Sequence, residues 1–308
     1  MMALLTVDKL SKTYQATSKK AVKDISFAVD HGDIVAFLGP NGAGKTTTLK
    51  MILNLVSPDH GKVYFEGKET TNDNLLLLKN TGVLLEGSRN MFWSLSPLEN
   101  FIYWGEQRGL SKAKAERSGL LLMKKFGLLD KKDTTITSLS RGMQQIVGVC
   151  CAMIAQPKLL ILDEPTLGLD LKSAQIVTNI LQELSANGVG ILITTHQLDF
   201  AQKVAQKILL INHGKLVFSD NVKESLARLN KQTLLELTLT RSLTLEEQEE
   251  ISTYCNLTKK QMNCYQLEVK SQKALPQVFN LLGKLPVRQI QTKERNLEDV
   301  FEYYTEEG

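Results

Sequence analysis

The stretch Gly39-Pro40-Asn41-Gly42-Ala43-Gly44-Lys45-Thr46-Thr47 decides the fold. It matches the pattern G-x-x-x-x-G-K-[ST], in which a glycine-rich backbone wraps around a phosphate and turns its N–H groups toward it. The apolar run from Ile34 to Leu38 precedes it as a buried-type strand, and Lys45 to Leu55 follows as a predicted helix. A strand before the loop and a helix after it are the context that a phosphate loop requires. The loop by itself predicts a nucleotide-binding protein.

The residues of this loop have distinct expected parts in phosphate binding. Lys45 supplies a cation for the β- and γ-phosphates, and the hydroxyl of Thr46 is a candidate ligand of Mg²⁺. The helix that begins at Lys45 adds the positive end of its dipole. The candidate nucleotide contacts are Gly39, Pro40, Asn41, Gly42, Ala43, Gly44, Lys45, Thr46 and Thr47.

Two carboxylates follow a second buried-type strand. The run Leu159 to Leu162 is wholly apolar, as central strands of parallel sheets are, and Asp163 and Glu164 come directly after it. Asp163 is expected to hold the Mg²⁺ shell, and Glu164 is expected to polarise the attacking water as a general base. A strand end with solvated acids is the alternative reading, which the phosphate loop makes much weaker.

The order of elements predicts an α/β fold with a mainly parallel sheet, because strands alternate with helices. Short apolar runs at 4–7, 25–29 and 63–65, separated by turn signals, predict a small antiparallel sheet beside the nucleotide. Residues 97–127 and 138–155 are predicted to be helical. We therefore expect a P-loop NTPase core with an antiparallel β subdomain and a helical subdomain.

The character of the chain changes after about residue 230. Apolar and polar residues alternate from Thr233 to Thr240, an acidic helix is predicted from Leu245 to Tyr254, and Asn296 is a candidate cap for a last helix. This region predicts a small α+β domain, too short for a second nucleotide site. The predicted domains are 1–228 and 229–308.

Composition excludes some classes of function. The 308 residues include 37 basic and 33 acidic side chains, a net charge of +4 with no long basic run, so nucleic acid is not an expected partner. The longest uncharged run, between Arg141 and Lys158, is too short and too polar to span a bilayer. Asp8 and Lys9 stand too early for a signal-peptide core. The sequence thus predicts no membrane segment, and its four cysteines without a CxxC pair fit a reducing cytosol.

Further motifs follow the loop in a fixed order and carry a family resemblance. The run Ser138-Leu139-Ser140-Arg141-Gly142-Met143-Gln144-Gln145 resembles the signature sequence of ATP-binding-cassette proteins, which most often reads LSGGQ. Gly168-Leu169-Asp170 resembles their D-loop, and Ile193-Thr194-Thr195-His196 resembles their switch strand. Tyr14 resembles the aromatic residue that stacks on adenine. The resemblance covers about residues 4–225.

The resemblance implies ATP hydrolysis with Mg²⁺ between two facing cassettes, most simply a homodimer. Each ATP would lie between the phosphate loop of one chain and the signature of the other, where Ser140 and Gly142 meet the γ-phosphate. Asp170 would belong to the same interface. His196 would contact the γ-phosphate and help to fix Glu164 and the water. The family also implies separate membrane permease subunits that hold the chain at the cytoplasmic face of the membrane.

The sequence departs from the family pattern at three positions. Arg141 stands where glycine is usual and Met143 where glutamine is usual, although Ser140 and Gly142 are kept, so activity is expected to survive. Glu86 stands where the family usually has the Q-loop glutamine, and its carboxylate can offer the same oxygen to Mg²⁺. This substitution resembles a branch of exporters of the drug, antibiotic-resistance and lantibiotic-immunity type.

Two other regions are informative about partners. Residues 92–104 hold five aromatic side chains, which either form the pocket for a short helix of the permease or fill the core of the helical subdomain. The end of the chain, Asn296 to Phe301, resembles the extra domain of type-2 exporter ATPases.

Three functions are weighed against one another. A transport ATPase with a separate permease, most simply an exporter, fits one cassette without a membrane span. A soluble cassette ATPase acting on ribosomes or DNA usually has two cassettes in one chain or a long coiled coil, and neither is present. A regulatory cassette without turnover is disfavoured by Glu164 and His196. The cargo cannot be identified, because it meets the permease.

Overall fold

The computed structural model describes residues 3–14, 19–70, 74–85, 91–230 and 233–306. These residues form two compact units: the first runs up to Val222 and also takes in the end of the chain from Tyr304, and the second runs from Lys223 to Tyr303. The division after Val222 falls at the start of helix α8 (Val222–Leu229), whereas the boundary expected after residue 228 falls near the end of that helix. No helix in the described ranges is long and apolar enough to cross a membrane.

The first unit is built around a mainly parallel sheet. Among the described residues its strand order is β10-β9-β3-β8-β7-β6, and only β10 pairs in the antiparallel sense. Every residue of β3, β7 and β8 is buried, as expected for strands covered on both faces. The predicted α/β fold is therefore confirmed. The strands are β3 (Ile34–Leu38), β6 (Thr81–Leu84), β7 (Leu159–Asp163), β8 (Gly190–Thr195), β9 (Lys207–Asn212) and β10 (Lys215–Asn221).

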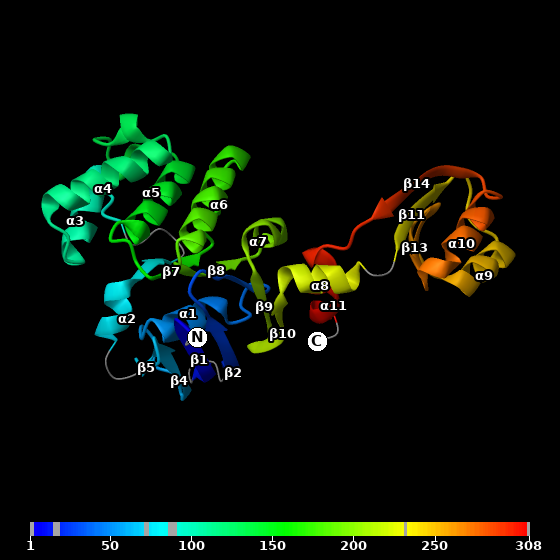
Figure 1. Cartoon of the computed structure of the whole chain (residues 1–308), viewed down its shortest axis with the longest axis horizontal. Helices are drawn as coiled ribbons and strands as arrows, with labels where there is room; N and C mark the ends of the chain where they lie inside the picture. Colours follow the sequence, from blue (N-terminus) through cyan, green and yellow to red (C-terminus); the bar gives the residue numbers. More distant parts are fainter. Residues whose placement is uncertain (1–2, 15–18, 71–73, 86–90, 231–232, 307–308) are drawn as a thin grey trace. The chain divides into compact units, whose positions relative to one another are not determined.

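A second sheet covers one face of this core. Its order is β2-β1-β4-β5 in the part of the chain that is described, and its strands pair antiparallel. Helix α1 (Lys45–Ile52) lies between the two sheets, and its Leu49, Met51 and Ile52 join a common apolar core with both (Figure 1). The predicted antiparallel subdomain is present, with longer strands than its apolar runs suggest: β1 (Leu5–Tyr14), β2 (Lys19–Val29), β4 (His60–Phe65) and β5 (Lys68–Glu69).

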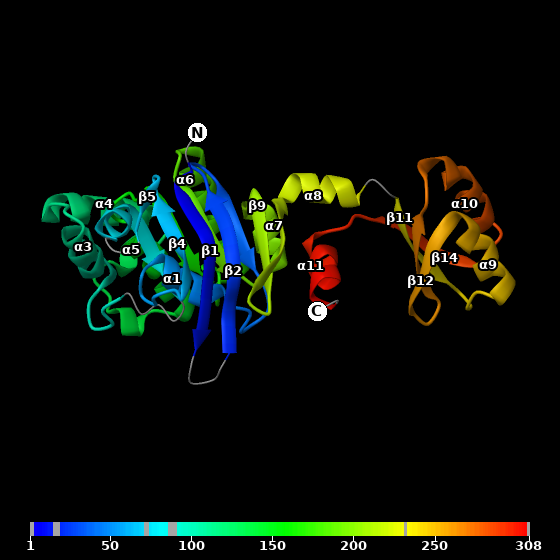
Figure 2. The same cartoon turned by 90° about the horizontal axis from the view of Figure 1, so that it is seen from below.

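Helices cover the other face of the parallel sheet and extend from it as a helical group (Figure 2). The region predicted as helical over 97–127 is two helices, because the chain turns at Gly109, which has φ 85°. Phe101 packs where Gly119 leaves room for its ring. These helices are α3 (Pro97–Gln107), α4 (Lys112–Lys125), α5 (Arg141–Met153), α6 (Leu171–Ala186) and α7 (Leu198–Val204), with short 3₁₀ helices at Leu129–Lys131 and Ile136–Ser138. Helix α2 (Leu75–Asn80) lies on the α1 side instead, where its Leu77 joins the apolar core that α1 shares with both sheets (Figure 1).

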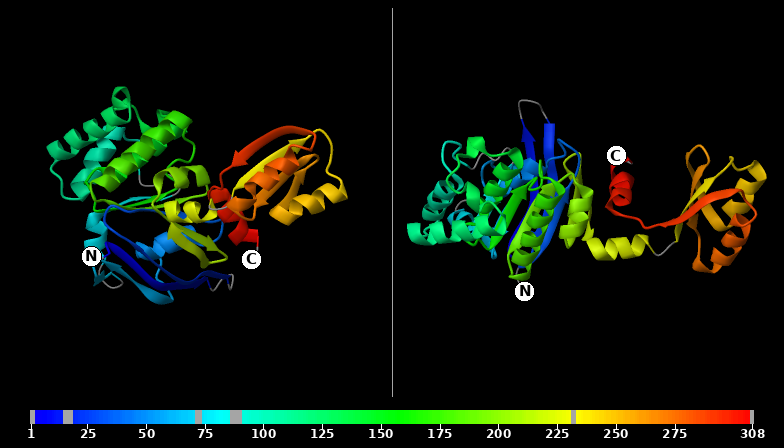
Figure 3. Two further views of the ribbon diagram at one scale, coloured as in Figure 1. Left: turned by 45° about the vertical axis from the view of Figure 1, so that its right-hand side comes forward. Right: turned by 90° about the horizontal axis from the view of Figure 1, so that it is seen from above.

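The second unit is a small α+β unit with its own core. Its described strands are ordered β12-β13-β11-β14, and α9 and α10 lie on one face of that sheet (Figure 3). Asn296 accepts hydrogen bonds from the N–H groups of Glu298 and Asp299, which confirms the predicted cap of the last helix. The elements are β11 (Leu234–Leu239), α9 (Leu245–Tyr254), β12 (Cys255–Gln261), β13 (Cys264–Val269), a 3₁₀ helix (Gln272–Ala274), α10 (Leu275–Leu282), β14 (Val287–Lys293) and α11 (Leu297–Glu306), which belongs to this unit up to Tyr303.

Candidate functional site

The glycine-rich turn between β3 and α1 shapes the site. Gly44 is the N-cap of α1 with φ 116°, a backbone conformation that favours glycine. A Cβ atom there would collide with the carbonyl oxygen of Ala21 on β2. The chain can therefore turn this tightly only with glycine at this position, and the turn points the first N–H groups of α1 into the site.

Lys45 is buried at the start of α1, although it carries a charge. Its ammonium group donates to the carbonyl oxygens of Gly39, at 2.5 Å, and Pro40, at 3.2 Å. A buried cation needs such acceptors, since burial without them costs several kcal/mol, about 2–7 on transfer scales for polar groups alone. The loop thus holds a positive charge next to its own N–H groups, an arrangement suited to a phosphate.

Asp163 lies at the carboxyl end of β7, between two threonine hydroxyls. The hydroxyl of Thr46 donates to Asp163 Oδ2 at 3.2 Å, and that of Thr194 donates to Asp163 Oδ1. Asp163 and Thr194 are register partners on neighbouring parallel strands, so the sheet itself brings them together. A hydroxyl and a carboxylate oxygen side by side next to a phosphate loop fit Mg²⁺, which binds one or two protein oxygens together with phosphates and water.

Glu164, the next residue, is 8% exposed, and its carboxylate has two neighbours. His196 Nδ1 lies 2.8 Å from Oε1, and Thr195 donates its hydroxyl to Oε2 at 3.3 Å. The backbone of Glu164 has φ 50°, a left-handed conformation that costs a non-glycine residue about 1–3 kcal/mol. Strain of this kind persists only where surrounding contacts enforce it, and it commonly marks a functional residue.

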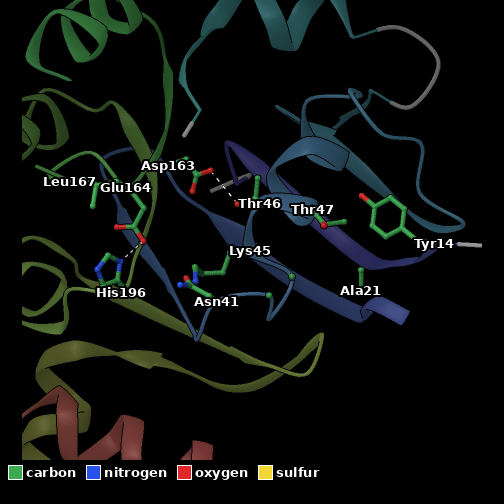
Figure 4. A pocket seen from close by; sticks show the side chains of 12 residues that line it. Tyr14, Ala21, Asn41, Lys45, Thr46, Thr47, Asp163, Glu164, Leu167 and His196 are labelled. Carbon is green, nitrogen blue, oxygen red and sulfur yellow. Dashed lines mark hydrogen bonds and ion pairs between the residues drawn. The ribbon is translucent and has the colours of Figure 1, made fainter. Parts of the chain in front are cut away.

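These groups surround one cavity of about 540 Å³ (Figure 4). His196 and Glu164 lie at one end, Lys45 and Thr46 lie in the middle, and Tyr14 lies at the other end. An elongated ligand with an aromatic base beside Tyr14 and phosphates beside Lys45 would match this order of side chains. The lining residues are Tyr14, Ala21, Asn41, Gly42, Gly44, Lys45, Thr46, Thr47, Asp163, Glu164, Leu167 and His196.

Three other predicted site residues lie elsewhere. Ser140 is the N-cap of α5, Asp170 is the N-cap of α6, and neither they nor Gly142 are among the described residues that line the cavity. A Cβ on Gly142 would lie 3.4 Å from the carbonyl oxygen of Gly168, so these two segments adjoin. Asp170 accepts the Ser173 N–H at 2.7 Å, which lowers the pKa of Asp170. Glu86 lies outside the described residues.

Other residues belong to the site without having been predicted. Ala21 and Leu167 line the cavity, Thr194 and Thr195 hold the two carboxylates, and the amide of Gln145 donates to the carbonyl oxygen of Glu164 at 2.9 Å. The threonines could have been found from their place before His196, because they end a buried-type strand and the carboxyl ends of neighbouring parallel strands lie at the same edge of a sheet. Ala21 and Gln145 carry no such signal, because only the tertiary fold brings them near.

A phosphate loop between β3 and α1, and two carboxylates at the end of β7, which is separated from β3 by β8 in the same parallel sheet, define the class, a P-loop domain that binds a nucleoside triphosphate. Comparison with known proteins identifies the family within this class. The family model described as ABC transporter matches residues 22–167. The chain belongs to this family, and it is an ATPase subunit with the ATP-binding cassette.

The relatives include proteins with stated roles. The ABC transporter ATP-binding protein NatA of Bacillus subtilis is 31% identical over 70% of this chain and 88% of its own length. YcbN of the same organism, an uncharacterized ABC transporter ATP-binding protein, is 32% identical over 98% of this chain and 96% of its own length. The daunorubicin/doxorubicin resistance ATP-binding protein DrrA of Streptomyces peucetius is 32% identical over 73% of this chain and 67% of its own length.

Solved structures agree in fold. A structure of an ATP-binding subunit of an ABC transporter is 31% identical, covers 73% of this chain and 92% of its own, and has a TM-score of 0.64. The ATP-binding cassette MJ0796, solved as a dimer bound to ADP and Pi, has a TM-score of 0.65 and 24% sequence identity. The match covers 70% of this chain and 98% of that chain. At that identity the second likeness concerns the fold alone.

Proposed function

We propose that this chain hydrolyses ATP to drive export through a separate membrane permease. The observation that carries the proposal is the single cavity that gathers Lys45, Thr46, Asp163, Glu164 and His196. A cation for phosphates, an oxygen pair for Mg²⁺ and a carboxylate paired with histidine are the groups that phosphoryl transfer to water requires.

Each side chain has one part in this reaction. Tyr14 stacks on adenine, and Lys45 and the N–H groups of the loop hold the β- and γ-phosphates. Thr46 and Asp163 would hold Mg²⁺, which would neutralise charge on those phosphates. Glu164 accepts a proton from the attacking water as the water oxygen bonds to the γ-phosphorus, while the bond from that phosphorus to the β,γ-bridging oxygen breaks and ADP leaves with the electron pair. His196, hydrogen-bonded to Glu164, keeps the carboxylate in the orientation in which it can accept that proton.

The position of the signature supports a dimer. Ser140 and Arg141 are exposed at the start of α5, and neither lines the cavity of its own chain. An N-capping hydroxyl and a helix N-terminus are suited to an anion, and they are free to meet one that a second copy holds. We therefore infer that two copies enclose two ATP molecules, each between a phosphate loop and the partner's signature.

The aromatic side chains of residues 92–104 supply a surface for the permease. Phe92, Trp93 and Tyr103 are exposed, whereas Phe101 is fully buried. The stretch can therefore contribute both to a surface for the permease and to the core of the helical subdomain. Exposed aromatic side chains offer large contact area at low entropic cost. The permease would hold this chain at the cytoplasmic face of the membrane. Relatives named for doxorubicin resistance and for SkfA peptide export favour a drug, antibiotic, peptide or lipid-like cargo.

The proposal is tested by co-expressing the chain with the membrane protein encoded beside it. We expect a detergent-stable complex, and in inverted membrane vesicles we expect ATP-dependent uptake of a cargo. Glu164→Gln should assemble the same complex without uptake and with only a residual rate of phosphate release. A chain that binds no membrane protein, and whose ATPase rate rises with nucleic acid in a salt-sensitive way, would instead be a soluble cassette ATPase.

A further inference from the structure

The signature helix contacts the backbone of the proposed catalytic base of its own chain. Gln145, half-buried on α5, donates its side-chain amide to the carbonyl oxygen of Glu164 at 2.9 Å. The contact joins two consecutive elements that belong to different parts of the first unit: α5 in the helical group and the end of β7 in the parallel sheet. It is not part of the cavity lining, and the reaction described above makes no use of it.

This contact acts on a strained residue. Glu164 has φ 50° and precedes Pro165, so its backbone is restricted from both sides. On its amino side the N–H group donates to Thr194, to the carbonyl oxygen at 3.0 Å and the hydroxyl at 3.3 Å. On its carboxyl side the carbonyl oxygen accepts from the side-chain amide of Gln145 at 2.9 Å and, within the following turn, from the Leu167 N–H at 3.2 Å. The strand β8 and the helix α5 therefore fix the two peptide planes that set the direction of the carboxylate.

The neighbouring glutamine shows that the contact is specific to one position. Gln144 donates its amide to the carbonyl oxygens of Ile136 and Leu139, at 3.0 and 3.1 Å, and so holds the segment that leads into the signature. Gln145 faces the other way, toward the end of β7. Adjacent side chains on a helix point in directions about 100° apart, so the two amides reach different elements.

We propose that Gln145 is a positioning residue for Glu164 and links the two ATP sites of the dimer. The link rests on the proposed function, in which Ser140 meets the ATP held by the partner. Ser140 and Gln145 are five residues apart, about 7.5 Å along one helix. The helix end that meets one ATP and the amide that orients the base acting on the other ATP therefore move as one body. Loss of the amide leaves Glu164 in place but less well oriented for proton transfer.

The test compares Gln145→Met with a matched control in the full-length chain, alone and with its permease. Methionine keeps the length and lacks the donor. Gln182→Met is the control, because Gln182 also donates a side-chain amide to a backbone carbonyl, that of Lys203 at 3.0 Å, away from the site. We expect kcat for ATP to fall about fivefold to tenfold in Gln145→Met, as for loss of one hydrogen bond. We expect KM, the affinity for ATP and the melting temperature to match those of Gln182→Met.

A double-mutant cycle separates positioning from general support. Because Gln145 acts through Glu164, adding Gln145→Met to Glu164→Gln should cause no further fall in kcat. An additive loss, a raised KM, or a kcat equal to that of Gln182→Met would overturn the proposal. If the wild-type chain itself does not hydrolyse ATP, the proposed function fails as well. If the wild-type chain hydrolyses ATP but Gln145→Met has the same kcat as Gln182→Met, the proposed function stands and only the inference about Gln145 is wrong.

Discussion

The Nδ1 atom of His196 lies 2.8 Å from Oε1 of Glu164, across the ends of two neighbouring parallel strands. Neither residue is in a strand: Glu164 follows β7 directly, and His196 follows β8 directly. Because parallel strands end at the same edge of a sheet, two residues 32 positions apart in the sequence share one hydrogen bond. This pairing limits the orientations open to the carboxylate that is proposed to accept the proton of water.

Replacement of His196 tests that pairing. His196→Ala should lower kcat for ATP hydrolysis on the order of 10²-fold, because the base loses the partner that holds its orientation, and ATP binding should change little. Steady-state phosphate release and nucleotide titration measure the two quantities. His31→Ala, in the exposed turn before β3, is the control and should behave as wild type. An unchanged kcat in His196→Ala would remove His196 from the reaction.

The hydroxyl of Thr46 can be tested apart from the shape of its side chain. Thr46→Val keeps the branched side chain and loses the oxygen, whereas Thr46→Ser keeps the oxygen. If Thr46 is a ligand, the Mg²⁺ concentration for half-maximal ATPase activity should rise roughly tenfold or more in the valine variant only. Removing Mg²⁺ with EDTA should stop turnover in all three proteins. Equal Mg²⁺ dependence of the valine and serine variants would contradict the assignment.

Much of the site could be predicted because it lies in short, contiguous motifs. Gly39 to Thr47 and the pair Asp163 and Glu164 are each one local segment between a strand and a helix or loop, so pattern alone locates them. Gln145 could not be predicted as a neighbour of Glu164, because the two meet only through packing of α5 on the end of β7. The left-handed backbone of Glu164 was likewise invisible, since sequence patterns assign φ above zero to glycine.

The ends of helices and the edge strands were harder to predict, because their side chains are exposed and so show no apolar pattern. Helix α6 begins at Leu171 because Asp170 caps it, and Leu171 itself is almost fully exposed, so no apolar pattern marks the first turn of this helix. Strand β12 was not predicted, since its Thr258-Lys259-Lys260-Gln261 end is exposed and polar on both faces. Edge strands of this kind carry charge that discourages further pairing, and they lack the alternation that marks a strand.

The second unit should depend on pH through Glu247. The bidentate hydrogen bonds of Arg241, with the Thr244 N–H, hold the pKa of Glu247 down to about 2, from its ordinary 4.5. A lowered folded-state pKa means that this contribution to stability is full above pH 4.5 and disappears as the pH falls toward 2. Glu247→Gln should therefore melt at a lower temperature than wild type at pH 7, and the difference should shrink below pH 4.5.

The matched control for this prediction lies on the same helix. Glu250 is exposed on α9, and Glu250→Gln should leave the pH profile of melting as in wild type. Thermal unfolding followed by circular dichroism between pH 2.5 and 7 is the measurement, with all buffers at one ionic strength. A constant difference between Glu247→Gln and wild type across this range would show that the ion pair adds nothing to the folded state.

The aromatic stretch at residues 92–104 offers two variants with opposite expected effects. Phe101 is 0% exposed and packs against Gly119, so Phe101→Ala should cost about 3–5 kcal/mol of stability through the cavity it leaves. Trp93 is 43% exposed, so Trp93→Ala should cost less than about 1 kcal/mol, since exposed substitutions rarely cost more.

If Phe92, Trp93 and Tyr103 form the surface that the permease contacts, Trp93→Ala should lose the permease complex in a pull-down while retaining ATP binding and its melting temperature. Phe101→Ala should show the opposite pattern: its melting temperature should fall, but it should still bind the permease when the pull-down is done at low temperature. A Trp93→Ala chain that binds the permease as tightly as wild type would place the docking surface elsewhere on the first unit.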